Sequence, residues 1–261
     1  MDEVTSNDGT TIAFDRYGAG PAIILVGGAF QHRAIDPQTK RLAELLAPSF
    51  TVFHYDRRGR GESGDTLPYA IEREVEDIAA LIDEAGGSAH AFGMSSGGVL
   101  VLEAAASGLP VTKLALYEPP WNVEESRRTE MQAYSRQLTT LLAEGRRGDA
   151  AALAMTTFGA PPEAVEGMRQ APVWAMFESV APTLAYDAAA MGDYSVPIRR
   201  AATVTVPAMV LDGGASPPWL GEAADAVAAA LPSAQRRTLE GQTHDVSPEV
   251  LAPALHEFFA A

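Results

Sequence analysis

The run Gly93-Met94-Ser95-Ser96-Gly97 holds the side chain best suited to nucleophilic chemistry, a serine at a predicted strand-to-helix turn. The run matches the pattern G-x-S-x-G, with an apolar stretch over 89–92 before it and a helical pattern over 95–106 around and after it. A serine on such a sharp turn needs small neighbours two positions away, and Gly93 and Gly97 meet that condition. The Ser96 N–H at the helix N-terminus would face a developing oxyanion. A plain Gly-Ser helix entry is the alternative, but the flanking strand and helix favour a nucleophile.

His244 is the candidate general base. It lies in the run Gly241-Gln242-Thr243-His244-Asp245, between the last predicted strand and the last predicted helix. The order of nucleophile first and histidine near the C-terminus fits serine hydrolases of the strand–turn–helix type. A histidine on a surface loop is the alternative. His54 and His90 lie in predicted strands and His256 in the last helix, so we expect structural roles for these three.

A second oxyanion donor is expected from the glycine-rich loop Gly27-Gly28-Ala29-Phe30, which follows the apolar strand 22–26. The Ala29 N–H is the candidate, because a loop at this point supplies the partner of the donor after the nucleophile. An ordinary glycine turn is the alternative. Residues near the two loops and at the start of the insertion are candidates for substrate binding: Phe30, His32, Met94 and Trp121.

Composition excludes several classes of site. The 261 residues contain no cysteine, which rules out disulfides, thiolate nucleophiles and Cys-ligated metals. The five histidines are scattered and form no HExxH pair, so we expect neither a metal nor a cofactor. The net charge of −15 and the lack of Lys/Arg clusters argue against nucleic-acid binding.

The sequence also predicts a cytoplasmic protein that acts on a small molecule. Its first residues, 1–4, include no basic region or apolar run typical of a signal peptide. No apolar run reaches the ~20 residues needed to cross a bilayer. The oligomeric state has no signature in the sequence.

The elements around these residues predict an α/β fold. Apolar runs alternate with helical patterns, which is typical of a mostly parallel sheet covered by helices on both faces. Residues 4–6 and 11–17 flank the turn Asn7-Asp8-Gly9, which predicts an antiparallel pair at the start. The remaining elements are a helix near 39–46, a strand 51–55, a helix 69–85, strands 89–92 and 113–117, strands 208–211 and 235–239, and a helix 248–259.

Residues 119–202 break the strand–helix alternation. Their pattern is helical, rich in Arg, Glu, Ala and Met, and interrupted near Gly159 and Gly192. We therefore predict a helical cap (lid) insertion at 119–202 and a core domain made of 1–118 and 203–261. The aromatic and Met side chains of the insertion either line an apolar pocket or simply pack the insertion on itself.

These features together resemble the α/β-hydrolase superfamily with a cap domain, and the resemblance covers nearly the whole chain. The run Tyr55-Asp56-Arg57-Arg58-Gly59-Arg60-Gly61-Glu62-Ser63-Gly64 is similar to the D-x-R-G-x-G-x-S turn of that superfamily. The resemblance implies that Asp56 holds this loop rather than doing chemistry. Gly27-Gly28 stands where members commonly carry His-Gly, which changes the pocket wall but keeps the backbone donor.

The triad acid departs from the common pattern. Members usually carry it a few residues after the strand that ends here at Leu211, and that register falls on Ser216, which cannot carry a charge. Relatives of haloalkane dehalogenases place the acid after the preceding strand, and that position is Glu118. We favour Glu118, with Asp212 as its rival and a structural strand-end residue as the alternative.

The predicted function is a serine hydrolase that cleaves a small, largely apolar carboxylic ester or lactone through an acyl-enzyme on Ser95. His244 would take the Ser95 proton and Glu118 would orient the imidazole. Two other classes stay open. One is a carbon–carbon bond hydrolase or lyase on the same fold, and the other is a non-catalytic ligand-binding member.

Overall fold

A mostly parallel sheet forms the centre of the protein, whose computed structural model describes residues 2–261. Its strands are β1 (Asp2–Thr5), β2 (Thr11–Tyr17), β3 (Ala22–Val26), β4 (Thr51–Tyr55), β5 (Ala89–Met94), β6 (Val111–Tyr117), β7 (Ala208–Gly213) and β8 (Ala234–Leu239). They lie in the order β1-β2-β4-β3-β5-β6-β7-β8. β2 pairs antiparallel with both β1 and β4, and all other neighbours are parallel. The predicted N-terminal hairpin and the parallel sheet are confirmed.

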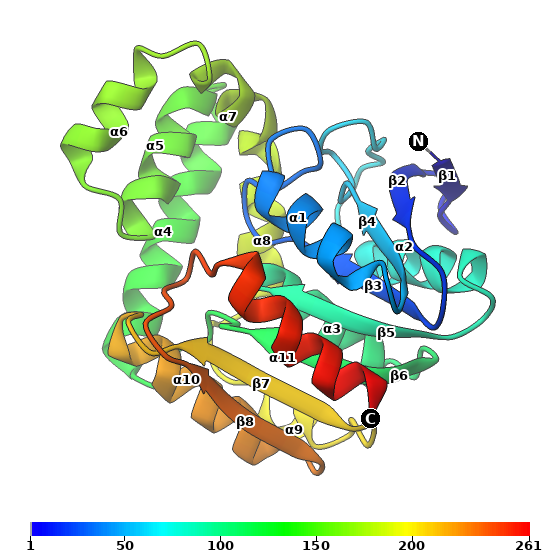
Figure 1. Ribbon diagram of the computed structural model, residues 1–261. Helices are drawn as coiled ribbons and strands as arrows, with labels where there is room; N and C mark the ends of the chain where they lie inside the picture. The colour runs from blue at the N-terminus through cyan, green and yellow to red at the C-terminus, as the bar shows by residue number, and fades with distance from the viewer. Residues whose placement is uncertain (1) are drawn as a thin grey trace.

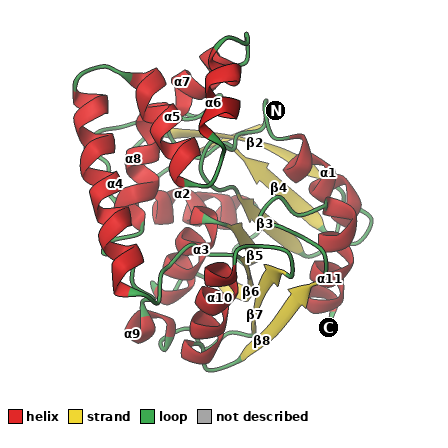
Figure 2. Cartoon of the chain, turned by 90° about the vertical axis from the view of Figure 1, so that its left-hand side faces the viewer, coloured by secondary structure: helices red, strands yellow, loops and turns green. Residues whose placement is uncertain are grey.

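Helices cover both faces of the sheet (Figure 2). One face carries α1 (Pro37–Leu46) and α11 (Pro248–Ala260), and the other carries α2 (Ile71–Glu84), α3 (Ser96–Ala106) and α10 (Pro218–Ala230). In β3 the side chains alternate between the two cores: Ile23 packs with α1 and α11, and Ile24 packs with α2 and α3. This burial on both faces explains the continuous apolar runs of the central strands. Helix α10 was missed in the sequence, because its alanine-rich pattern has little amphipathic contrast.

The turn after β4 is held by the Asp56 carboxylate. This carboxylate accepts the backbone N–H groups of Arg33 at 2.7 Å and Glu62 at 2.9 Å. Arg58, buried beside it, binds Asp77 through two hydrogen bonds of 2.6 and 2.8 Å. The basic run therefore faces inward, where Glu74 and Asp77 of α2 and Asp187 of the later helix 184–190 neutralise it. Asp56 contributes to the shape of the turn, as the sequence suggested.

The chain between β6 and β7 is helical. It forms α4 (Glu125–Ala143), α5 (Arg147–Thr157), α6 (Pro162–Arg169), α7 (Trp174–Val180), a 3-10 turn (Ala181–Thr183), α8 (Leu184–Ala190) and α9 (Ile198–Ala201). Helices α4 to α7 stand to one side of the sheet (Figure 1) and share a separate apolar cluster that includes Leu138, Ala154 and Trp174. The ends of the insertion are different, because Trp121 and Tyr194 belong to the main core. The division into a core and a cap at 119–202 stays a prediction.

None of the helices within residues 2–261 is both long enough and apolar enough to span a bilayer.

Candidate active site

Ser95 occupies a sharp turn between β5 and α3. Its backbone has a φ of 54° and a ψ of −126°, outside the regions that most residues adopt. Its N–H donates to the carbonyl of Tyr117 on the neighbouring strand at 2.9 Å. The turn is packed so closely that a Cβ on Gly93 would lie 2.4 Å from the Gly97 carbonyl oxygen. The two flanking glycines of the motif are therefore required by space.

Gly97 gives a direct test of this packing. A Cβ at Gly97 would lie 2.1 Å from the Val26 carbonyl oxygen, which is backbone and cannot move aside. Gly97→Ala is therefore expected to destabilise the protein by roughly 2–3 kcal/mol or more, or to prevent folding. Gly98→Ala is the matched control, because its nearest neighbours would be 3.3 Å away or more. Urea unfolding of the two variants checks the difference, and equal midpoints would contradict the predicted packing.

Glu118 lies directly after β6 and is completely buried, with an exposed fraction of 0%. One carboxylate oxygen, Oε1, accepts the Gly213 N–H at 2.8 Å. The other, Oε2, lies 2.6 Å from Nδ1 of His244. When the carboxylate accepts in this pair, Nδ1 is the donor, and the second ring nitrogen, Nε2, is not engaged by Glu118. The geometry leaves Nε2 as the nitrogen of His244 able to take a proton.

The loop that carries His244 is fixed on the ends of β6 and β7. The Tyr117 hydroxyl donates to the Thr243 carbonyl at 2.5 Å, and the Ala215 N–H donates to the Gln242 carbonyl at 2.8 Å. The His244 side chain remains 43% exposed. Among residues 2–261 its ring makes a hydrogen bond with Glu118 and none with Ser95. Such contacts are often long before substrate binds.

The two other positions considered for the acid lie elsewhere. Asp212 makes an ion pair of 2.8 Å with Arg236 on β8. The Ser216 hydroxyl is buried and, within the described chain, has no hydrogen-bond partner. Of the three positions, Glu118 is the one that contacts His244.

Ser95 and His244 line one cavity of about 380 Å³. Its apolar wall comes from both the core and the insertion: Phe30, Met94, Met131, Phe158, Met191, Trp219 and Leu220. Its polar lining includes Gln31, Asn122, Arg127, Asp187 and Asp245. Helix α4 contributes Met131 and Tyr134 to the lining, and the turn after α5 contributes Phe158 and Gly159.

Two of the four residues predicted to bind substrate lie outside this lining. Phe30 and Met94 line the cavity, whereas His32 and Trp121 do not. Trp121 is in the main core, and its N–H donates to the Pro119 carbonyl at 2.9 Å in a tight turn. His32 is buried near the Asp56 turn, and burial lowers its pKa. No local sequence pattern distinguishes a residue buried in the core from one that lines the cavity.

The two candidate oxyanion donors flank Ser95. Ser96 is the first residue of α3, where backbone N–H groups have no acceptor within the helix. The loop that carries Ala29 passes so close that a Cβ on Gly28 would lie 2.9 Å from Ser95 Cβ. Among the loop, turn and cap hydrogen bonds of residues 2–261, none has the Ala29 N–H or the Ser96 N–H as its donor.

A buried charge network beneath Ser96 was missed in the sequence. Asp187 of α8 accepts hydrogen bonds from Arg57 at 2.6 Å, Arg60 at 2.7 Å and the Ser96 hydroxyl at 2.7 Å. Arg57 also binds Glu74 at 2.6 Å. Burial alone would raise the pKa of Asp187, but Arg60 and Arg57 hold it below the usual value. The network attaches α8 to the turn that carries Ser95, and the basic run 56–61 was its only sequence signal.

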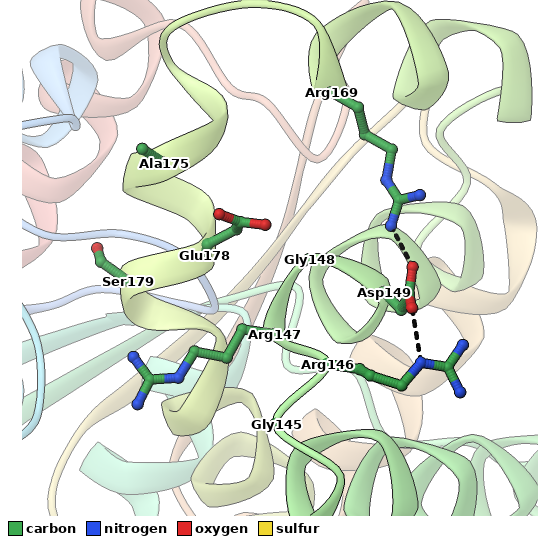
Figure 3. Close-up of a pocket in the computed structure, with 9 residues that line it drawn as sticks. All are labelled: Gly145, Arg146, Arg147, Gly148, Asp149, Arg169, Ala175, Glu178 and Ser179. Atoms are coloured by element: carbon green, nitrogen blue, oxygen red, sulfur yellow. Dashed lines mark hydrogen bonds and ion pairs between the residues drawn. The ribbon is translucent and has the colours of Figure 1, made fainter.

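A second, more open cavity of about 560 Å³ lies within the insertion (Figure 3). It is lined by polar residues of α5 to α7 and the turn before α5. Asp149 there pairs with Arg146 at 2.8 Å and with Arg169. Neither Ser95 nor His244 lines it. No group of three or more His, Cys, Asp or Glu in the described chain could hold a metal ion.

Comparison with known proteins agrees with this architecture. The family model described as "Alpha/beta hydrolase family" matches residues 23–254. An α/β hydrolase from Sphaerobacter thermophilus is 54% identical, with a TM-score of 0.88 over 99% of this chain and 100% of that one.

More distant solved structures share the fold. A thermophilic esterase from Thermogutta terrifontis, solved with malate bound, is 24% identical with a TM-score of 0.75 over 99% of this chain and 97% of that one. The enol-lactonase from Burkholderia xenovorans is 20% identical, with a TM-score of 0.67 over the full length of both chains. The match of the family model and the extent of the Sphaerobacter similarity show that this chain belongs to the α/β-hydrolase family.

Proposed function

We propose that the protein is a serine hydrolase that cleaves a small, largely apolar carboxylic ester or lactone through an acyl-enzyme on Ser95. The observation that carries this proposal is the 2.6 Å contact between the Glu118 carboxylate and Nδ1 of His244. His244 lines the same cavity as Ser95. A buried carboxylate on Nδ1 leaves Nε2 of the imidazole as a base. Membership of a hydrolase family agrees with this chemistry.

In the proposed reaction the Ser95 oxygen attacks the carbonyl carbon while Nε2 of His244 takes the hydroxyl proton. The imidazolium then gives that proton to the leaving alkoxide, and the acyl group remains on Ser95. A water molecule, deprotonated by the same nitrogen, attacks the acyl carbon, and the imidazolium returns this proton to the Ser95 oxygen as the acyl–oxygen bond breaks, which releases the acid and restores the serine. Glu118 stays ionised and stabilises the imidazolium.

The N–H groups of Ala29 and Ser96 would bind the oxyanion of the tetrahedral intermediate. Each such donor contributes about 3–4 kcal/mol to the transition state in comparable sites. The N-terminus of α3 adds a favourable dipole at the same point. The charge network at Ser96 would keep this turn rigid.

The substrate class is proposed from the cavity. A volume of about 380 Å³ and a wall rich in Met and aromatic side chains fit a small apolar acyl or alcohol group. The esterase and the enol-lactonase among the similar structures act on bonds of this class by their names.

Covalent labelling tests the proposal. A fluorophosphonate probe is expected to modify Ser95, located by peptide mass spectrometry, and to stop hydrolysis of 4-nitrophenyl acetate and butanoate. A panel of small lactones extends the test to the cyclic substrates. A protein that takes no label at Ser95 and hydrolyses none of these compounds would refute the proposal.

A further inference from the structure

Arg127 introduces a positive charge into a cavity whose lining is largely apolar. It lies in the first turn of α4 and lines the cavity together with Ser95 and His244. Its guanidinium carbon lies 3.9 Å from the centre of the Trp219 ring on α10. This stacking fixes the plane of the guanidinium and leaves its N–H edges directed outward from the ring.

No group in the described chain uses those donors. Among residues 2–261, Arg127 makes neither an ion pair within 4.0 Å nor a hydrogen bond, and its Nε is buried without a partner. Glu124 and Glu130 lie one turn away along the sequence and do not pair with it. This contrasts with Arg57, whose guanidinium is bound by Asp187 and Glu74. The side chain as a whole is partly exposed, but a polar atom as buried as this Nε normally has a hydrogen-bond partner.

A second unpaired polar atom borders the same cavity. Asn122 is 3% exposed, and its Oδ1 is buried without a hydrogen-bond partner while Nδ2 donates to the Pro120 carbonyl. If the two ends of this amide were exchanged, one of them would still lack a partner. Asn122 and Arg127 both line the cavity and each has a buried polar atom without a partner, which indicates a polar group of the ligand near them.

The charges of the lining indicate the sign of that group. Asp187 is neutralised by Arg57 and Arg60, and Asp245 is exposed and accepts from Gln38 at 2.9 Å. Arg127 is the one Arg or Lys among the cavity residues that the structure describes. A single cation matches a group with a single negative charge, and the planar fork of arginine matches a carboxylate. The net charge of −15 repels anions at long range, so an anionic substrate would depend on such a local cation.

We propose that Arg127, held by Trp219, binds a free carboxylate of the substrate, so that the preferred ester or lactone carries one negative charge away from the reacting carbonyl. This proposal rests on the proposed function. It makes Arg127 a specificity residue and leaves the chemistry to Ser95 and His244.

Matched pairs of esters test it. 4-Nitrophenyl hemiglutarate and 4-nitrophenyl pentanoate differ by a carboxylate on the acyl side. 4-Carboxyphenyl acetate and 4-methylphenyl acetate differ by one on the alcohol side. The measured quantity is the preference ratio, which is kcat/KM for the charged ester divided by kcat/KM for its neutral partner. For at least one pair, Arg127→Gln is expected to lower this ratio by roughly 10- to 100-fold, because a charge-assisted hydrogen bond is lost. Arg127→Lys should retain part of the preference, since it keeps the charge without the fork.

Arg136→Gln is the matched control. Arg136 is exposed on the same helix and does not line the cavity, so the variant makes the same change in net charge outside the site. Its ratio is expected to stay within about twofold of the wild type, because solvent screens an exposed charge. A ratio in Arg127→Gln equal to that of Arg136→Gln for both pairs would overturn the carboxylate subsite.

Binding separates this proposal from the proposed function. Monomethyl glutarate is titrated by calorimetry into Ser95→Ala and into Ser95→Ala/Arg127→Gln, neither of which needs turnover. Roughly tenfold or greater weakening in the double variant supports the subsite even if no ester is hydrolysed. Equal affinity, or no binding to Ser95→Ala, refutes the subsite. Hydrolysis of neutral esters with no discrimination at Arg127 refutes the subsite alone.

Discussion

Replacing Ser95 with alanine is expected to reduce ester hydrolysis by a factor on the order of 10⁶, the loss known for removal of a serine nucleophile in a comparable enzyme. The remaining rate would come from the oxyanion donors and from binding. The fold should persist, because the Ser95 hydroxyl makes no hydrogen bond within residues 2–261 and alanine fits the same backbone. Steady-state rates with 4-nitrophenyl butanoate and thermal unfolding of the variant check both parts.

Ser107→Ala provides the control. Ser107 lies just beyond the other end of α3, and its hydroxyl donates to the Glu103 carbonyl at 2.8 Å. The same change there should leave the rate close to that of the wild type. Retention of more than a small fraction of activity by folded Ser95→Ala would show that another group is the nucleophile.

Glu118→Gln is expected to lower kcat by a factor on the order of 10⁴, the effect of an acid-to-amide change in a serine protease triad. The amide oxygen can still accept the Gly213 N–H, which directs the new NH₂ group toward His244. The NH₂ group would donate to Nδ1 and so favour the tautomer with the proton on Nε2. A protonated Nε2 cannot take the proton of Ser95. The variant also lacks the charge that stabilises the imidazolium.

Asp212→Asn is the matched comparison for the acid. It removes a carboxylate that, like that of Glu118, lies near the C-terminal end of a central strand. The Asp212 carboxylate, however, binds Arg236 and does not contact the histidine. Its effect on kcat should be far smaller. A large loss at Asp212 with little loss at Glu118 would assign the acid to the later strand. Little loss at either would mean that His244 acts without a carboxylate.

The strand–turn–helix around Ser95 could be predicted from the sequence because its requirements are local. A run of β-forming residues, two glycines that flank Ser95 and a helix after them are enough to define the turn. The strands could be predicted for a similar reason, since burial on both faces leaves continuous apolar runs such as 22–26. His244 followed from its place between the last strand and the last helix.

The partner of His244 depends on tertiary structure. In the sequence Glu118, Asp212 and Ser216 all follow predicted strands, and Glu118 was favoured only by resemblance; in the structure Asp212 lies within β7. The register of β6 against β7 and the path of the loop at 242–244 bring the Glu118 carboxylate to Nδ1, while β8 supplies Arg236 for Asp212. These contacts join residues distant in sequence, so no local pattern encodes them.

The cavity wall was the least predictable part. His32 and Trp121 were expected there and are buried elsewhere, whereas Arg127 of α4 and Trp219 of α10 line it in contact with each other. By itself the sequence determined the fold, the turn that carries Ser95 and the loop that carries His244, because each follows from neighbours along the chain. Only the tertiary structure decided which acid meets the histidine and which charge faces the cavity, because both depend on how the insertion and the sheet pack together.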